Sequence, residues 1–349
     1  MRIITTLSVI FTALTLSAQQ ARILPQHDMA QWGIPAGNYS GITPLGGDRY
    51  ALVSDKQEAD GWTEVSIRFT PKGDIASMDF VATHYTPAQG PTARDAEDLV
   101  ATRQGTVFVA AESDQRIVEY NAEAHPTGRE LAVPAWCNVK SIYGNYGFEA
   151  LAYNAADGSF WTTTEHALRI DSEAPSTHDN PLPTRHRLLH FNASLRPTAV
   201  YAYRTDAPIV KGSTSAYAFG IPAMTCANSG KTLYVMEREI AVTPRYDGSF
   251  CRIAIFSVDP TKSTPITLDA TTSLKDAADG NFIAKTRLAE FTTSLRIAGR
   301  KTLANYEGMC LGPTLPDGRQ TLLLVADSQN RAGNKLFRLK DYIRVVVLP

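Results

Sequence analysis

Short hydrophobic runs with the character of β-strands recur along this chain in five similar copies. Each copy has a short apolar run, a turn that contains glycine, and a second run rich in β-branched and aromatic residues that ends in a carboxylate. From the first marked position to the terminal acid, the copies cover residues 40–55, 97–112, 149–165, 222–237 and 307–327. The pattern predicts five β-hairpins at equivalent places of a repeated architecture.

Two further strand-like runs follow each hairpin. They cover residues 64–69 and 78–85, 116–120 and 129–133, 187–191 and 199–203, 252–258 and 287–291, and 335–339 and 343–348. Four strands per repeat are typical of a propeller blade. We therefore predict an all-β fold, a β-propeller with five readable four-stranded blades closed around a central channel.

The spacing of the copies is uneven, and this leaves the number of blades open. Inserted loops are expected at 171–185 and 259–279, where the third and fourth repeats are longest. A sixth, degenerate blade is an alternative to five. It could lie in the 85-residue interval before the last copy, or be assembled from Ile23 and Leu24 with C-terminal strands.

The N-terminus has the three parts of a secretory signal peptide. Arg2 gives a basic start, residues 3–16 form an apolar stretch, and Ser17 and Ala18 are small residues before a cleavage site. We expect residues 1–18 to be cleaved and 19–349 to form a single domain, exported to the periplasm or the extracellular space. A buried N-terminal strand or helix is the alternative. No later stretch reaches the roughly 18 apolar residues of a transmembrane segment.

Charge adds an exclusion. The chain has 34 Lys and Arg residues against 35 Asp and Glu residues, and neither sign is concentrated in one block. A nucleic-acid-binding protein would be expected to carry a basic patch or stripe, so we expect no nucleic-acid partner. No strand or helix presents an unpaired apolar face, and we expect a monomer.

Four cysteines remain after the predicted cleavage, at positions 137, 226, 251 and 310, and none forms a C-x-x-C pair. Export would permit one or two disulfides. Cys226 with Cys251 is the first choice because both lie in one predicted blade. Four buried thiols in strands are an equal alternative.

The repeated carboxylates are the main chemical signal. If the repeats are in register, equivalent acids form rings around one mouth of the channel. The first ring would hold Glu97, Glu149 and Glu307, with Ser40 and Pro222 at the places without an acid. The second ring would hold Asp55, Glu112, Glu165, Glu237 and Asp327.

These eight carboxylates would repel one another in one cavity unless a cation or basic side chains compensated them. Oxygen ligands in such number, without a histidine cluster, suit Ca²⁺ better than zinc. The sequence therefore predicts a calcium site at the channel mouth. The alternative is that the acids cap turns, pair with arginine or accept backbone N–H bonds.

Basic partners lie close to the acids in sequence. Arg94 precedes Glu97, and Arg238 follows Glu237 directly. Each could bind a phosphate oxygen or neutralise a neighbouring glutamate. His166 is the only histidine next to a repeat acid, and a structural role is expected for it. The sequence has no G-x-S-x-G or H-E-x-x-H motif.

Three of the repeated segments also resemble a known family. They are residues 148–151 with 161–165, residues 233–238, and residues 305–309 with 317–319 and 322–327. They are similar to the phytase-like family, also described as "esterase-like activity of phytase", and the resemblance extends from about Gly41 to Leu339. It implies a secreted propeller that hydrolyses phosphate esters or related esters. The acids of the family correspond to Glu97, Glu149, Glu165, Glu237, Glu307 and Asp327, whereas Pro222 departs from the pattern.

Two classes of function follow. The first is a metal-dependent hydrolase of phosphate esters that uses Ca²⁺, in which Glu149, Glu165 and Glu307 do the chemistry. Arg94 and Arg238 would hold phosphate, and all eight repeat acids are candidate ligands. The second is a non-catalytic envelope propeller that binds a protein, glycan or nutrient. A calcium-dependent lactonase or carboxyl-ester hydrolase would share the metal and differ in its small-molecule substrate.

Overall fold

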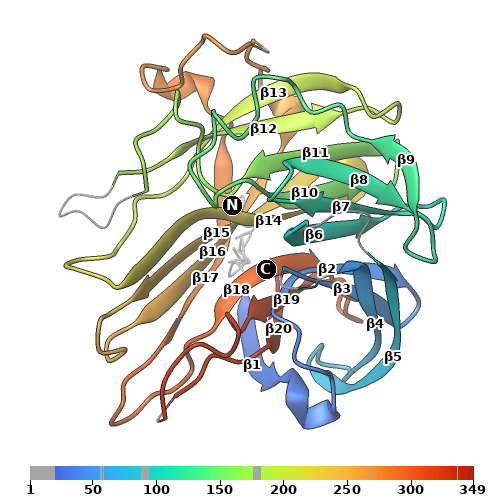
Figure 1. Cartoon of the computed structure of the whole chain (residues 1–349), viewed down its shortest axis with the longest axis vertical. Coiled ribbons are helices and arrows are strands. Elements are labelled where there is room, and N and C mark those ends of the chain that lie inside the picture. The colour runs from blue at the N-terminus through green and yellow to red at the C-terminus, as the bar shows by residue number, and fades with distance from the viewer. Residues whose placement is uncertain are drawn as a thin grey trace, which may run out of the picture.

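The computed structural model describes residues 20–55, 57, 59–87, 94–175, 182–267, 269–335 and 337–349. In this part of the chain, twenty β-strands form five four-stranded antiparallel sheets, which are arranged as the blades of a β-propeller (Figure 1). The predicted all-β fold with five blades is confirmed. The predicted signal peptide, residues 1–18, lies outside the described residues.

The first four blades each use four consecutive strands, with the innermost strand first. Blade 1 contains β2 (Tyr39–Gly46), β3 (Arg49–Ser54), β4 (Ala59–Phe69) and β5 (Ile75–Pro87). Blade 2 contains β6 (Ala96–Ala101), β7 (Val107–Ala111), β8 (Arg116–Tyr120) and β9 (Pro126–Glu130). Blade 3 contains β10 (Phe148–Asn154), β11 (Ser159–Thr164), β12 (Arg185–Phe191) and β13 (Pro197–Arg204). Blade 4 contains β14 (Ala216–Ala227), β15 (Thr232–Val242), β16 (Phe250–Val258) and β17 (Lys285–Ser294).

Blade 5 joins the two ends of the described chain. It contains β18 (Asn305–Leu311), β19 (Thr321–Asp327), β20 (Tyr342–Val347) and, as its outermost strand, β1 (Arg22–Asp28). The N-terminal strand pairs antiparallel with β20 and so closes the ring.

This closure corrects two sequence expectations. The predicted strand 335–339 is not among the strands of blade 5 in the described residues, which leave out residue 336, because β1 takes the outer position. Arg338 of this run forms an isolated bridge with Gly333. Ile23 belongs to β1 and helps to complete the fifth blade instead of a sixth. The described chain contains no sixth sheet.

Hydrophobic contacts between neighbouring blades form the core. Each of five buried clusters draws its residues from two adjacent blades. Phe108 of blade 2 and Phe160 of blade 3, for example, have ring centroids 4.6 Å apart. Packing of this kind in every interface fixes the inner strands β2, β6, β10, β14 and β18 as a closed ring.

Helix is minor in the part of the chain that the structure describes. It consists of the short 3-10 turns η1 (Met29–Trp32), η2 (Asn228–Gly230), η3 (Pro260–Lys262) and η4 (Asp279–Asn281). Among the described residues, no helix is long and apolar enough to cross a membrane.

The long connection between β16 and β17 belongs to blade 4 but covers blade 3. Ile266 of this loop forms a bridge with Val200 on β13. Arg187 of β12 pairs with buried Asp171 at 2.7 Å and donates to the carbonyl oxygen of Asp269 in the loop, also at 2.7 Å. The predicted insertions therefore are loops, apart from residues 176–181 and 268, which lie outside the described residues.

The four cysteines are free and buried, so the expected disulfide between Cys226 and Cys251 is wrong. Cys226 pairs with Leu233 and Cys251 pairs with Ile240, at opposite ends of the same strand β15. Seven residues of strand separate these partners, or about 23 Å at roughly 3.3 Å per residue, whereas a disulfide needs Cα atoms within about 7 Å.

Denatured, unreduced mature protein should therefore take up four alkyl groups per chain from iodoacetamide. The native protein should react far more slowly, because burial raises the pKa of the Cys137, Cys226 and Cys251 thiols to about 12 and the thiolate is the reactive form. Intact-mass spectrometry measures both. Only two labelled thiols in the denatured, unreduced protein would reveal a disulfide and contradict the prediction.

Candidate active site

Every innermost strand carries a β-bulge at the same place. In blades 1, 2, 3 and 5, the pairing with the second strand skips one residue, namely Ser40, Glu97, Glu149 and Glu307 respectively. In blade 4 the interruption falls between Gly220 and Ala223 and includes Pro222. A bulge re-aims the side chain of its extra residue, and the three glutamates line one cavity. The first predicted ring is therefore present, with gaps at Ser40 and Pro222.

Each member of the second ring lies on, or directly after, the second strand of its blade. There it pairs with the residue two positions before the bulge of the innermost strand. Asp327 pairs with Asn305, Arg238 pairs with Gly220, and the backbone N of Glu165 donates to the carbonyl of Gly147 at 2.7 Å. The same register in the other two blades gives the complete ring: Asp55, Glu112, Glu165, Arg238 and Asp327.

Arg238 thus occupies the ring position that was predicted for Glu237. From Pro222 to Arg238 is 16 residues, the same separation as from Glu149 to Glu165. Because side chains alternate along a strand, a shift of one residue turns Glu237 to the opposite face. The expectation that Glu237 faces the channel is wrong.

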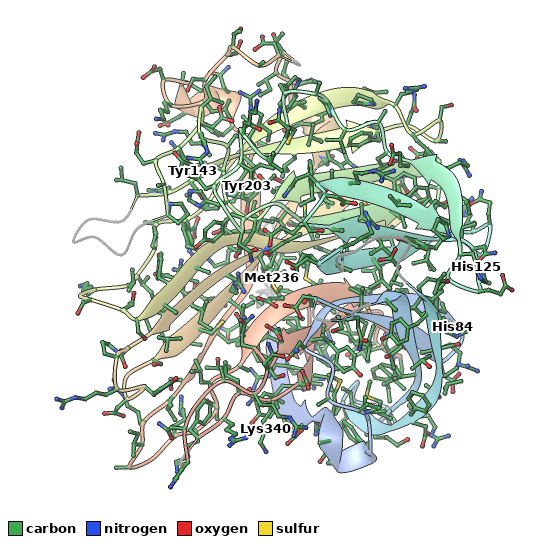
Figure 2. All side chains as sticks on the ribbon, viewed as in Figure 1. His84, His125, Tyr143, Tyr203, Met236 and Lys340 are labelled. Atoms are coloured by element: carbon green, nitrogen blue, oxygen red, sulfur yellow. The ribbon has the colours of Figure 1, made fainter. Side chains whose placement is uncertain are left out.

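Glu237 instead joins blades 3 and 4. Its carboxylate accepts hydrogen bonds from Tyr203 Oη at 2.6 Å and from the backbone N of Asp206 at 2.9 Å, and it pairs with Lys285 Nζ at 2.5 Å. Figure 2 labels Tyr203. All the oxygens of Glu237 are committed to this interface, which leaves none for the cavity.

Arg94 also has structural partners. Its guanidinium pairs with Asp114 at 2.8 Å and donates to Tyr120 Oη at 2.8 Å and to the carbonyl of Arg116 at 3.1 Å. All three partners belong to blade 2 or its connecting turn, and Arg94 does not line the acidic cavity. The structure therefore does not bring Arg94 together with the glutamates.

Two of the predicted acids bind the backbone. Glu112 Oε1 accepts a hydrogen bond from the backbone N of Gly147 at 2.5 Å, which links blade 2 to blade 3. Asp327 accepts from the backbone N of Gln329 at 2.8 Å. Neither acid lines the cavity itself.

Sequence reasoning missed Asp95. One carboxylate oxygen each of Asp55, Asp95 and Glu97 lie within 4.8 Å of one another. Asp95 stands two residues before its bulge, at φ 57°, and Asn38 at the equivalent place of blade 1 has φ 48°. The signal available in the sequence was this third repeated position, which Asn, Asp or Gly occupies in every copy.

The cavity at this mouth has a volume of about 530 Å³. Five carboxylates line it, from Asp55, Glu97, Glu149, Glu165 and Glu307. Arg238 is the only arginine or lysine in its lining, and no histidine or cysteine takes part, as far as the described residues go. Aromatic and aliphatic side chains, most of them from blades 4 and 5, form much of the remaining wall.

Arg238 balances part of this charge. Its guanidinium pairs with both Glu165 and Glu307, and it donates to Asn305 Oδ1 at 2.8 Å. Asn305 Nδ2 donates in turn to Glu307 Oε1 at 2.7 Å. Arg238 therefore fixes two of the five carboxylates on the side of blades 3 to 5.

Glu97 and Glu149 are left without such partners. Each residue is only 8% exposed, and neither carboxylate has a hydrogen bond or ion pair within the described ranges. Burial raises the pKa of both well above the usual range, and neighbouring carboxylates raise it further, Glu307 first for Glu97 and Glu165 first for Glu149. Burial also raises the pKa of Glu307 to about 7, against the opposing effect of Arg238.

An apolar ring lies below the acids. Two residues after each bulge, the inner strands carry Ile42, Leu99, Leu151, Met224 and Met309, all at most 2% exposed. These side chains line a separate cavity of about 330 Å³ at the opposite mouth. The apolar ring therefore lies between the acidic cavity and the cavity at the opposite mouth.

This arrangement can hold a hard cation. Carboxylate oxygens are the ligands that Ca²⁺ prefers, and the absence of histidine and cysteine from the described lining argues against a zinc-type site. Unpartnered buried carboxylates are costly unless they are protonated or a cation neutralises them. The carboxylates of Asp55, Asp95 and Glu97 together could hold a metal ion.

Several solved structures are similar to this chain at low sequence identity. Similar solved structures include a luciferin-regenerating enzyme (10% identity, 93% of this chain and 95% of that chain, TM-score 0.41). A virginiamycin B lyase from Staphylococcus aureus is 10% identical over 95% of this chain and 100% of that chain, with a TM-score of 0.36. A gluconolactonase from Xanthomonas campestris is 10% identical over 95% and 96%, with a TM-score of 0.36.

No curated protein matches the sequence significantly. The family description "Phytase-like: Esterase-like activity of phytase" matches residues 34–329, which include all five inner strands and every acid of the cavity. This chain therefore belongs to the phytase-like family.

Proposed function

We propose that the acidic cavity is the active site of a calcium-dependent hydrolase of phosphate esters. The observation that carries this proposal is the pair Glu97 and Glu149, two buried carboxylates that face the cavity without a hydrogen-bond or ion-pair partner among the described residues. Buried charge of this kind is tolerated where a ligand completes it. The enzyme would act as an exported monomer on a small-molecule ester.

Asp55, Asp95 and Glu97 would hold the cation, because their oxygens already lie within 4.8 Å of one another. When bound, Ca²⁺ would supply a Lewis acid that polarises the phosphoryl group and offsets its negative charge. Two other carboxylates of the cavity, those of Glu165 and Glu307, are instead paired with Arg238.

Glu149 is the residue we assign as the general base. Its carboxylate is buried, lines the cavity and is free of ion pairs, so it can accept the proton of an attacking water. Burial and the neighbouring carboxylates raise its pKa above the usual range, which makes its carboxylate a stronger base than that of an exposed glutamate. Glu165 and Glu307 keep Arg238 in place and are positioning residues in this assignment.

A second candidate is a carboxyl ester or lactone as substrate. Arg238, the arginine in the described lining of the cavity, is already paired with two glutamates. A neutral ester would enter this cavity without electrostatic repulsion, whereas a phosphate depends on the cation. The same metal and the same base would serve both reactions.

Calcium titration separates the two assigned roles. Glu97→Gln should weaken calcium binding at least about tenfold, because it removes a ligand charge. Glu149→Gln should retain calcium binding and lose about 10² to 10⁴ of kcat on an aryl phosphate, because it removes only the base. Calorimetry and turnover with and without chelator are the measurements.

The matched control is Glu64→Gln, which changes an acid of β4 that pairs with Arg49 outside the cavity. It should leave both calcium binding and turnover unchanged. Absence of calcium binding and of chelator-sensitive turnover in the unmodified protein would exclude the proposal and favour a binding propeller.

Stability of the calcium-free protein should fall as pH rises. The pKa of Glu307 is about 7 in the fold against an ordinary value of 4.5, so the folded state binds more protons than the unfolded state between these values. The titration of Glu307 alone then lowers the free energy of unfolding by on the order of 3 kcal/mol across this window. Urea unfolding between about pH 5 and pH 8 with chelator measures the loss, and a flat profile would contradict it.

A further inference from the structure

Blade 4 forms one wall of the acidic cavity, and this wall differs from the others in its longer strands and its apolar side chains. Its strands β14 and β15 have 12 and 11 residues, whereas the innermost strands of the other blades have 6 to 8. The additional length, Ala216–Gly220 paired with Arg238–Val242, lies on the acidic side of the bulge. Blade 4 therefore rises beyond the other blades as a wall beside the carboxylates.

Aromatic and aliphatic side chains border the cavity on both faces of this wall, because Tyr217 and Ile240 point to opposite faces of the paired strands. Tyr217, Ile240, Val242 and Tyr246 line the cavity from blade 4, and Phe337 lines it from the loop before β20. Ile240 and Phe337 belong to the buried cluster between blades 4 and 5, with Val242 and Tyr246 packed against it. The wall is thus a rigid extension of the core.

Two tyrosine rings are held in fixed positions. Tyr217 Oη donates to Glu239 Oε1 at 3.3 Å, and Glu239 is fully buried and also accepts from the backbone N of Val210 at 2.7 Å. Tyr146 Oη donates to the carbonyl oxygen of Tyr217 at 3.3 Å. Because the hydroxyl groups are committed to these bonds, the rings present their apolar bodies to the cavity, and little side-chain freedom is left to lose on binding.

The charge of the cavity limits how many phosphates it can accept. Five carboxylates line it against one arginine, which already pairs with two of them. One phosphate can be compensated by a cation at the acidic cluster. Inositol hexakisphosphate carries about 9 to 12 negative charges, at roughly 1.5 to 2 per phosphate, and no lysine lines the described cavity to receive them.

We infer that the substrate is a monoester of one phosphate with an aromatic or large apolar alcohol, whose organic group packs against Tyr217, Tyr246 and Phe337. This inference rests on the proposed function for the ester chemistry, and it specifies the substrate class. The phosphate lies at the acidic side and the apolar group lies against blade 4, so each wall of the cavity binds one end of the substrate.

Hydrolysis of 2-phenylethyl phosphate, glycerol 3-phosphate and inositol hexakisphosphate, each with calcium, tests the inference. The first two are phosphates of primary alcohols, so their intrinsic reactivities are similar and the organic group is the main difference. We expect kcat/KM for 2-phenylethyl phosphate to exceed that for glycerol 3-phosphate at least about tenfold, as burial of an aromatic ring allows. We expect the hexakisphosphate to be the poorest substrate.

Binding provides a readout that is independent of turnover. Calorimetry with 2-phenylethylphosphonate and methylphosphonate, neither of which is hydrolysed, should give the aromatic compound about tenfold higher affinity. Tyr217→Ala and Tyr246→Ala should each reduce this preference. Tyr153→Ala is the matched control, because Tyr153 lines the cavity at the opposite mouth, and it should keep the preference.

The outcomes are distinguishable from failure of the proposed function. Loss of all turnover together with a retained aromatic preference in phosphonate binding would exclude the hydrolase and support the apolar site. Equal affinities for the two phosphonates, or faster turnover of the hexakisphosphate than of 2-phenylethyl phosphate, would overturn the inference while calcium-dependent hydrolysis stands.

Discussion

The channel mouth depends on how five buried carboxylates are kept together in one cavity. Two of them, Glu165 and Glu307, share the guanidinium of Arg238, which stands in a ring whose other members are all acidic. This single cation divides the cavity into a compensated half and an uncompensated half. The uncompensated half contains Glu97 and Glu149, and it is there that a ligand has most to contribute.

The backbone makes this division possible. A bulge in each inner strand adds one residue at a fixed place, so Glu97, Glu149 and Glu307 reach the same cavity from different blades. The apolar ring two residues further along separates this cavity from the cavity at the opposite mouth. The positions of the acidic ring and of the apolar ring thus both follow from the bulge that recurs in every inner strand.

Much of this could be predicted from the sequence because the repeats are local. Five hairpins with the same order of strand, glycine-containing turn and strand predict five blades. The first ring of acids follows from the alignment of these hairpins. Glu237 could not be placed correctly, since a shift of one residue in blade 4 is invisible in the pattern yet reverses which face a side chain takes. The predictions that Arg94 lies beside the glutamates and that Cys226 and Cys251 form a disulfide were wrong for a related reason. Closeness in sequence or within one blade does not fix distance in space.

The connection between β16 and β17 belongs to blade 4 but packs on blade 3, and this contact affects how the ring of blades unfolds. In a propeller of independent blades, each sheet could unfold locally at its own free energy. Here Arg187 and Asp171 of blade 3 hold the carbonyl of Asp269 and the backbone N of Leu274 from blade 4, in a buried contact. Separating either blade breaks this buried ion-pair network, so we expect blades 3 and 4 to open together in hydrogen exchange. The wall and the base of the proposed site, Tyr217 and Glu149, would then share one local stability.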